Sequence, residues 1–406
     1  MRMGALEDVE RSENSDLAVK IYIGQRSASV STVDTSPATL DALMERAVAM
    51  ARLAPENPWA GLAPEELLLK GDAPDLDQVD PHGEPPVERL RAMALEAEDA
   101  ARAIDGVTNS DGASAGFSIA HEALVTSHGF AGCDSATGVS LSASVIAGTG
   151  GGMQRDHDWH SARHLADLDA AQKIGMTAGT RAVGRLNPGT MGSGRKPVLF
   201  DARVAGSLIG HLLSAMAGPV IARRKSFLLE REGARLFPAD IVIDEDPLRP
   251  RGLKSHAFDA EGVATKANRV VDAGVIGGWR CDAAAARQLG LSSTGHSGGN
   301  GAIASSNLAM RPGSLTRDEL MADVQDGVLV TELIGQGVDP LTGDYSRGAS
   351  GWRIVNGQLA GPVAGFTIAG NLIDIYADLA AANDLNTRFS VHVPTLRTDS
   401  MTIAGD

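Results

Sequence analysis

Two histidines in the first half of the chain, His160 and His164, have the spacing of a metal-binding pair. Residues four positions apart lie on one face of a helix, and imidazole is a common zinc ligand. We predict such a helix at this point, over about Ser161–Val183. A zinc peptidase of the H-E-x-x-H type also needs a glutamate beside the first histidine, where this chain has Ser161. The residues just upstream are more typical of a solvated helix start: Asp156, His157 and Asp158.

The run Gly295-His296-Ser297-Gly298-Gly299 matches the G-x-S-x-G nucleophile elbow of serine hydrolases. That elbow needs a strand before the serine and a helix after it, so that the hydroxyl is exposed on a tight turn. Here the upstream segment Asp282–Leu289 is rich in alanine and predicts a helix, and small polar residues follow over Asn300–Asn307. We therefore predict a glycine loop that bends the backbone, without a catalytic serine.

A second glycine-rich run, Gly148–Gly152, follows an apolar segment, as in dinucleotide-binding proteins. Met153 stands where that fingerprint needs its third glycine, and Gln154-Arg155-Asp156 does not open an apolar helix. The run therefore predicts a flexible loop.

One more histidine, His211, lies inside the uncharged segment Val204–Ala222. The segment is long enough to cross a membrane, but it contains glycine, serine and proline residues. We predict a buried helix that ends near Pro219. A lone histidine in such a helix is more often a core residue than a ligand, and composition alone does not decide between the two.

These residues are positioned by two halves of different character. In the first half, alternating apolar residues predict a hairpin over Leu17–Val33, with its turn at Gly24-Gln25. Helices are predicted from Pro37, after the N-cap Ser36, to just before Pro55, and over Pro86–Ile104. The segment Gly116–Ala147 alternates with period two and predicts an antiparallel meander.

The glycine- and proline-rich segment Gly184–Lys196 has no periodicity and predicts a boundary between residues 1–190 and 197–406. Beyond it, Asp272-Ala273-Gly274 and Asn356-Gly357 each separate two apolar pairs and predict hairpins. Thr316, with Glu319 three residues later, predicts a capped helix that runs to about Asp326. The second half is therefore mostly β-structure.

The composition and the net charge argue against a nucleic acid partner, a disulfide framework and a secreted protein. The 406 residues carry a formal net charge of −15, which repels phosphate backbones, and no long Lys/Arg run offsets it, so we expect no nucleic acid partner. Cys133 and Cys281 lie far apart in sequence, which suits a reducing compartment without a disulfide framework. The charged segment Met1–Asp16 lacks the apolar core of a signal peptide, so we expect a cytoplasmic protein without a membrane partner.

Five stretches of the second half resemble the TldD/PmbA family, and most closely its PmbA (TldE) branch. They are Phe258–Val263, Ala286–His296, Gly335–Val338, Thr342–Ala349 and Thr367–Leu372. The first half is also similar, in Ser127–Phe130 and in the helix pair around Leu40 and Leu90. The family usually begins with a further helix and strand, so the chain looks N-terminally short, which would leave an unpaired sheet edge.

The resemblance implies a zinc metalloprotease made of two related subunits, of which one is catalytic. In the catalytic TldD-type subunit a helix carries H-E-x-x-x-H, and a cysteine near the C-terminus completes the metal site. Carried over to this chain, the second histidine is His211, but the first falls on Gly206 and the glutamate on Ser207. The cysteine-bearing loop falls between Asn386 and Pro394, where there is no cysteine.

These departures predict a chain with no catalytic residue and no metal of its own. Zinc sites draw their affinity from several ligands together, and a serine hydroxyl is not a general base. The resemblance then implies that zinc is bound by a TldD-type partner and that this chain contributes a cleft that binds substrate. The candidate cleft residues are His211, Gly295, His296, Asp344, Ser346 and Arg347.

The sequence therefore predicts an α+β protein with an N-terminal antiparallel sheet and helices, and a mostly β, barrel-like C-terminal domain with a buried helix. Its expected function is that of a non-catalytic PmbA/TldE-type subunit in a heterodimer that cleaves small or unfolded peptides, such as peptide-antibiotic precursors and antitoxins. A homodimer in the absence of the partner is a further alternative that the sequence leaves open. Two alternatives remain open: a self-sufficient metallopeptidase that uses His211 or the pair His160 and His164, and a gyrase-associated regulatory protein.

Overall fold

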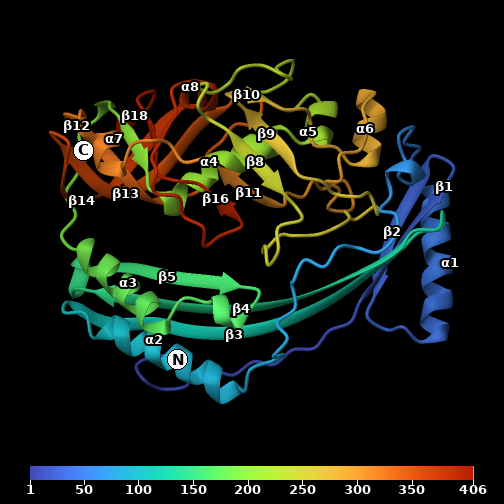
Figure 1. The fold of residues 1–406 in the computed structure, drawn as a ribbon, viewed down its shortest axis with the longest axis horizontal. Coiled ribbons are helices and arrows are strands. Elements are labelled where there is room, and N and C mark those ends of the chain that lie inside the picture. The colour runs from blue at the N-terminus through green and yellow to red at the C-terminus, as the bar shows by residue number, and fades with distance from the viewer. Residues whose placement is uncertain (406) are drawn as a thin grey trace.

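The computed structural model describes residues 1–405, which form three parts. A hairpin and one helix make the N-terminal part, a three-stranded sheet with two helices makes the central part, and a larger β-rich part follows (Figure 1). The β-rich part lies over the central sheet, and the N-terminal part stands at one end of both. The predicted α+β fold is confirmed.

The N-terminal hairpin pairs β1 (Leu17–Ile23) with β2 (Arg26–Thr32) in antiparallel register. Gly24 makes the turn with a φ of 58°, a left-handed conformation that glycine adopts without strain. Helix α1 (Pro37–Leu53) begins at the proline and buries Leu43 and Ala47 against the hairpin. The hairpin and the helix lie where the sequence predicts them.

The central part is a long antiparallel ribbon covered by two helices on one face (Figure 1). Its elements are α2 (Val87–Arg102), β3 (Val107–Val125), β4 (Ala131–Ala147), β5 (Gln154–Ala162) and α3 (Ala171–Gly184). The two helices pack very closely, since a methyl group at Gly175 would lie 2.0 Å from the carbonyl oxygen of Ala97. The small residues of both helices therefore permit this packing.

The predicted helix over Ser161–Val183 is wrong in its first part. Ser161 belongs to β5, which pairs with β4, and α3 begins only at Ala171. Alternate residues of β5, Asp156 and Asp158, are buried, so the segment has a strand period that the expected helix does not explain. The predicted flexible loop at Gly148–Gly152 contains a short 3-10 turn over Gly150–Gly152.

The far tip of the β3–β4 ribbon contacts the β-rich part of the molecule. Phe130 at the tip packs edge-on against Phe258 of the β-rich part, with ring centroids 5.1 Å apart. Leu68, which precedes the central sheet in sequence, joins the same apolar cluster together with Val263 and Ala283. The ribbon is thereby fixed at the end opposite to α2 and α3.

The β-rich part contains two sheets around one large core. The eight-stranded sheet has the order β15-β17-β7-β12-β13-β14-β18-β6, and the five-stranded sheet has the order β10-β9-β8-β11-β16. The strands are β6 (Gly194–Arg195), β7 (Val198–Phe200), β8 (Ile243–Asp246), β9 (Asn268–Asp272), β10 (Val275–Ile276), β11 (Asn307–Met310), β12 (Asp326–Ile334), β13 (Asp344–Val355), β14 (Gln358–Asn371), β15 (Ala380–Ala381), β16 (Val391–His392), β17 (Leu396–Thr398) and β18 (Thr402–Ala404).

Both predicted hairpin turns of this part are confirmed. Ala273 and Gly274 join β9 to β10, and Asn356 and Gly357 join β13 to β14. All four residues have positive φ, the conformation that two-residue turns of this kind require.

The predicted buried helix is α4 (Ala202–Ala215), which puts Leu208, Ile209 and Leu212 wholly into the core. It ends before Pro219, which lies in a separate short helix, α5 (Gly218–Ala222). Among residues 1–405, no helix has both the length and the apolar character needed to span a bilayer.

The remaining helices are α6 (Ala283–Leu289), α7 (Arg317–Met321) and α8 (Leu372–Ala377). The predicted capping box is present, because Thr316 and Glu319 exchange side-chain to backbone hydrogen bonds at the start of α7. The helix ends at Met321 rather than near Asp326, since Asp326 already pairs with Val355 as the first residue of β12.

Candidate functional site

The imidazole of His211 meets a strand that is distant in sequence. The alternation of β13 puts Tyr345 and Arg347 on one face of the sheet and leaves Ser346 exposed on the other. His211 and Tyr345 are in edge-on contact, with ring centroids 6.0 Å apart. Tyr345 is 1% exposed, whereas His211 and Arg347 are half-buried.

These three side chains share an unusual feature, which is a buried polar atom without a hydrogen-bond partner. The atoms are His211 Nε2, the Tyr345 hydroxyl oxygen and Arg347 Nε. Most buried polar groups in proteins are paired, because an unpaired one loses its hydration without compensation. The cluster therefore requires an explanation that the fold alone does not give.

The charge state of the cluster follows from its surroundings. Burial, reinforced by the positive charge of Arg347, lowers the pKa of His211, so the imidazole is neutral at neutral pH. Burial raises the pKa of Tyr345 to about 12, so the phenol keeps its proton. The cluster thus carries one positive charge, that of Arg347, beside two neutral polar groups.

The loop of residues 386–394 passes next to the same helix. A methyl group at Gly206 would lie 3.7 Å from Val391 Cγ1. Arg388 of this loop binds Asp158 of β5 through both guanidinium Nη atoms, and Phe389 packs on Trp159 with ring centroids 4.9 Å apart. The loop therefore connects α4 to the central sheet.

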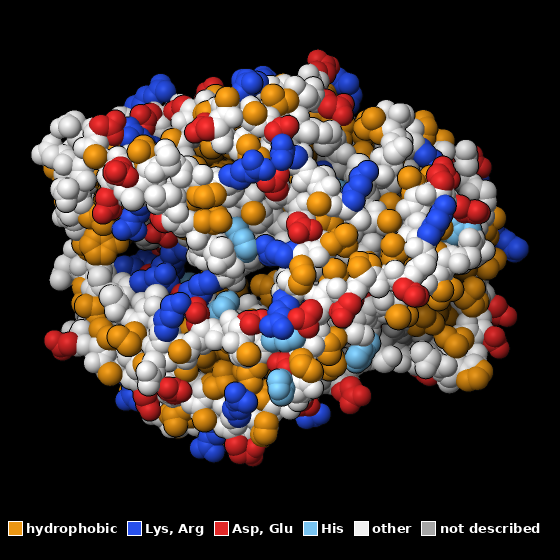
Figure 2. All heavy atoms as spheres, in the orientation of Figure 1, with side chains coloured by type: hydrophobic (Ala, Val, Ile, Leu, Met, Phe, Trp, Pro, Cys, Tyr) orange, Lys and Arg blue, Asp and Glu red, His pale blue; other side chains and the backbone are white. Residues whose placement is uncertain are grey.

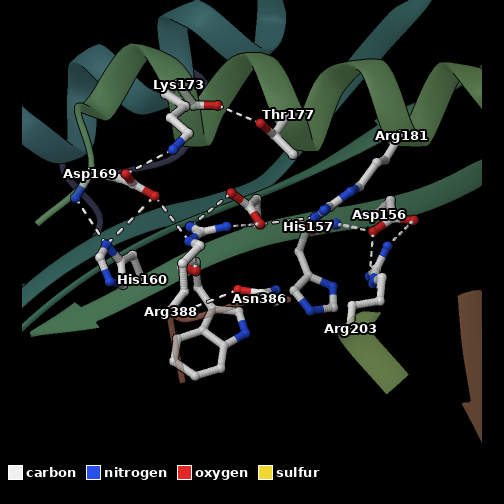
Figure 3. A network of polar contacts seen from close by, with 12 residues as sticks. Asp156, His157, His160, Asp169, Lys173, Thr177, Arg181, Arg203, Asn386 and Arg388 are labelled. Carbon is white, nitrogen blue, oxygen red and sulfur yellow. Dashed lines mark hydrogen bonds and ion pairs between the residues drawn. The ribbon is translucent and has the colours of Figure 1, made fainter. Parts of the chain in front are cut away.

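A network of ion pairs runs between β5, α3 and α4 (Figure 3). Asp156 of β5 accepts hydrogen bonds from Arg203 at the start of α4 and from Arg185 just after α3. Arg203 holds the pKa of Asp156 below its usual value despite the burial of this carboxyl. Basic side chains gather in the hollow between the central sheet and the β-rich part, where β5 and α4 face each other (Figure 2).

His160 and His164 do not form a pair. His160 lies on β5, and its Nδ1 accepts a hydrogen bond from the backbone N–H of Asp169. His164 lies beyond the end of β5, and its Nε2 contacts the carbonyl oxygen of Asp77 at 2.9 Å. The expected common helix face is absent because the segment is a strand, and each imidazole has its own structural contact.

The other candidate cleft residues lie apart from His211 and Arg347. Asp344, like Ser346, is exposed on β13, and its carboxylate accepts hydrogen bonds from Thr342 and Asn371. Gly295 and His296 lie in a loop of the β-rich part, where Ser297 donates its backbone N–H to Asp259. The predicted glycine loop replaces the strand, turn and helix of a nucleophile elbow.

His296 belongs to a buried polar cluster that the sequence did not indicate. Its Nε2 lies 3.1 Å from a carboxylate oxygen of Glu245, which also receives the guanidinium of Arg280 and the hydroxyl of Ser306. These contacts keep the pKa of Glu245 far below its usual value although the side chain is fully buried. Glu245 lies between two aspartates in β8, so its own sequence neighbours gave no sign that this one carboxylate is buried.

Comparisons with known proteins agree with one another over the whole chain. Family models described as PmbA/TldA metallopeptidase domain 1, central domain and C-terminal domain match residues 1–51, 80–186 and 193–405. The chain is 36% identical to metalloprotease PmbA of Escherichia coli O157:H7, over all of this chain and 89% of that protein. The chain belongs to the PmbA/TldD family. A PmbA homologue of Haemophilus influenzae is 34% identical over all of this chain and 89% of its own length.

Solved structures of PmbA/TldD relatives have the same fold. A protein of Bacteroides thetaiotaomicron that is called a modulator of DNA gyrase superposes with a TM-score of 0.89 and 26% identity, over 96% of this chain and 88% of its own. TldE of Thermococcus kodakarensis superposes with a TM-score of 0.86 and 19% identity, over all of this chain and 93% of its own. The second likeness concerns the fold alone.

The PmbA/TldD family name implies a metal, and the residues around His211 do not fit one. Gly206 has no ligand atom in its side chain, and the hydroxyl of Ser207 donates to the carbonyl oxygen of Val204 within α4. Arg347 adds a positive charge next to the single imidazole, which opposes a divalent cation. Among residues 1–405, no three His, Cys, Asp or Glu side chains are grouped so that they could hold a metal ion.

Proposed function

We propose that this chain is the non-catalytic, PmbA/TldE-type subunit of a cytoplasmic heterodimeric metalloprotease. A TldD-type partner supplies zinc and the catalytic groups, and this chain binds part of the substrate. The substrates are small or unfolded peptides, including peptide-antibiotic precursors and antitoxins. The observation that supports the proposal is the arrangement around His211, where an arginine accompanies a single imidazole. The resemblance implies that this imidazole corresponds to the second histidine of the H-E-x-x-x-H motif of TldD-type subunits.

The chain offers extended backbone near the proposed site. Strands β13 and β14 lie inside the eight-stranded sheet, where neighbouring strands already pair with their backbone, whereas β16 (Val391–His392) is an edge strand of the five-stranded sheet. Val391 lies beside Gly206 of α4. An unfolded peptide can add to this free edge through backbone hydrogen bonds, which do not depend on its sequence. This mode of binding suits substrates that have little sequence in common.

The test is to purify the chain alone and after co-expression with a TldD-type protein of the same organism that has an intact H-E-x-x-x-H. We expect a stable heterodimer that hydrolyses an unfolded peptide, while the chain alone binds no stoichiometric zinc and has no activity. A partner in which the motif glutamate is replaced by glutamine is the control, because it should assemble without hydrolysis.

Three results would contradict this function. One is stoichiometric zinc in the chain alone that His211→Ala or His160→Ala removes. Another is hydrolysis by the chain alone that a chelator abolishes. Co-purification with gyrase in place of the TldD-type protein would instead support a regulatory binding role.

A further inference from the structure

The cluster of His211, Tyr345 and Arg347 contains hydrogen-bond donors that could bind a hydrogen-bond acceptor of a ligand. The phenol of Tyr345 is almost completely buried and still protonated, so it can donate a hydrogen bond. The guanidinium of Arg347 is a permanent donor. Arg347 lies close enough to the phenol to lower its pKa in part, but the Tyr345 hydroxyl oxygen and Arg347 Nε have no partner in hydrogen-bond geometry among residues 1–405.

Arginines elsewhere on the same sheet show how the chain treats a guanidinium that has only a structural role. Arg353, six residues further along β13, contacts the carboxylate of Asp326 at 3.1 Å. Arg397 on β17 is paired with Asp323 and Asp399. Arg347 is half-buried and lacks such a carboxylate in the described part of the chain, although burial of an unpaired charge costs free energy.

The donors also define the chemistry of the ligand. A guanidinium presents parallel N–H groups in one plane, which match the two oxygens of a carboxylate. The phenol adds a third donor, and a neutral imidazole can donate from Nε2. His211 and Arg347 are partly exposed, whereas Tyr345 and the three unpaired atoms are buried. A ligand would therefore enter past His211 and Arg347, whose side chains must turn to receive it, and would meet the phenol last.

We propose that His211, Tyr345 and Arg347 form a binding site for a carboxylate group of a peptide. The proposal rests on the peptide-binding function above and specifies which chemical group of the peptide this chain holds. The carboxylate is either the C-terminal one or that of an acidic side chain. Arg347 provides the charge, and Tyr345 discriminates against groups that cannot accept a hydrogen bond.

The experiment measures the binding of three unlabelled, N-acetylated, unstructured decapeptides of Gly, Ala and Ser to the full chain by isothermal titration calorimetry. One peptide has a free C-terminus, one is amidated, and one is amidated with a single central Glu. We expect the amidated peptide without Glu to bind at least about tenfold more weakly than the free-acid peptide, the Glu peptide, or both. The reason is that hydrogen bonds to a charged carboxylate are stronger than those to a neutral group. Tighter binding of the free acid identifies the C-terminus, and tighter binding of the Glu peptide identifies a side chain.

Variants locate the effect at the cluster. R347Q should bind all three peptides as weakly as the wild type binds the neutral one, whereas the matched variant R353Q on the same strand should bind like the wild type. Y345F should reduce the discrimination severalfold without lowering the melting temperature, because it removes only a buried hydroxyl without a partner. Circular dichroism confirms that each variant is folded.

Equal affinities for all three peptides, with no effect of R347Q, would overturn the carboxylate site and leave the peptide-binding function intact. Displacement of the peptide by inorganic phosphate, but not by acetate at the same concentration, would also overturn it, because the site would then select phosphate. If no peptide binds to the chain or to its heterodimer, the proposed function and the carboxylate site are both wrong.

Discussion

Arg388 and Asp158 form a two-point ion pair that joins the loop of residues 386–394 to the central sheet. The distances are 3.1 Å for Nη1 to Oδ1 and 3.1 Å for Nη2 to Oδ2. Arg388 Nε also lies 2.9 Å from Asp169. The loop of residues 386–394 therefore holds two parts of the chain together.

Replacement of Arg388 by glutamine should loosen this loop. Asp158 keeps its second partner, Arg181, so we expect a loss of about 1–2 kcal/mol in the free energy of unfolding. Amide hydrogens of residues 386–394 should exchange faster, as measured by hydrogen exchange and mass spectrometry. Arg353→Gln is the control, because its ion pair with Asp326 is solvated and should contribute less than about 1 kcal/mol. Unchanged exchange in the loop would show that the pair does not hold it.

Glu261 should make the free energy of unfolding depend on pH between about 4.5 and about 7. Burial, with the nearby charges of Asp259 and Asp282, raises the pKa of Glu261 to about 7. In the unfolded chain the pKa of Glu261 returns to its ordinary value of 4.5, so between pH 4.5 and about 7 the folded state keeps a proton that the unfolded state has lost. The free energy of unfolding therefore falls as the pH rises through this range. Glu261→Gln should therefore gain stability relative to the wild type with rising pH, by at most about 1.4 kcal/mol per pH unit.

Urea denaturation of both proteins between pH 4.5 and 8 measures this difference. The glutamine oxygen can still accept the hydrogen bond from the backbone N–H of Ala283, which keeps the start of α6 intact. A difference that stays constant over this range would show that the Glu261 carboxyl titrates normally.

Glu245→Gln should be among the most damaging single changes in the β-rich part. It leaves the guanidinium of Arg280, which is 4% exposed, without its carboxylate. Breaking one partner of a buried ion pair costs about 3–5 kcal/mol. The neighbouring change Asp244→Asn is a matched control, because its pairs with Arg269 and Arg311 are at the surface and should cost no more than about 1 kcal/mol. Similar denaturation midpoints for the two variants would contradict this assignment.

Gly175→Ala should destabilise the packing of α3 on α2. Its methyl group would overlap the carbonyl oxygen of Ala97, and overpacking of this kind costs about 1–3 kcal/mol. Gly210→Ala in α4 makes the same chemical change where no atom lies within 4 Å, so it should stabilise the helix by about 0.5–1 kcal/mol. Thermal unfolding should thus shift in opposite directions, and a shift in the same direction would show that α2 can move away.

Local patterns predicted those parts of the fold that local interactions determine. The turns at Gly274 and Gly357 and the capping box at Thr316 depend on residues within a few positions of one another, and all three are present. The strand β5 was missed because its pairing with β4 is not visible in its own residues. His160 was therefore predicted on a helix, although it lies on the third strand of the central sheet.

The candidate site was predictable only in part, for the same reason. The resemblance pointed to His211, and Arg347 was named as a cleft residue, but nothing in the sequence indicated that α4 and β13 would bring them together. Tyr345 lies within the resembling segment Thr342–Ala349 but was not named as a cleft residue. Its significance depends on a hydroxyl that has no partner, which only a three-dimensional structure can show.

The tip of the β3–β4 ribbon, where Phe130 meets Phe258 and Leu68, has a mechanical consequence. The ribbon carries α2 and α3 at one end and this apolar contact at the other. The central part and the β-rich part are therefore joined at two separate places, at this tip and at the ion pair of Asp156 with Arg203.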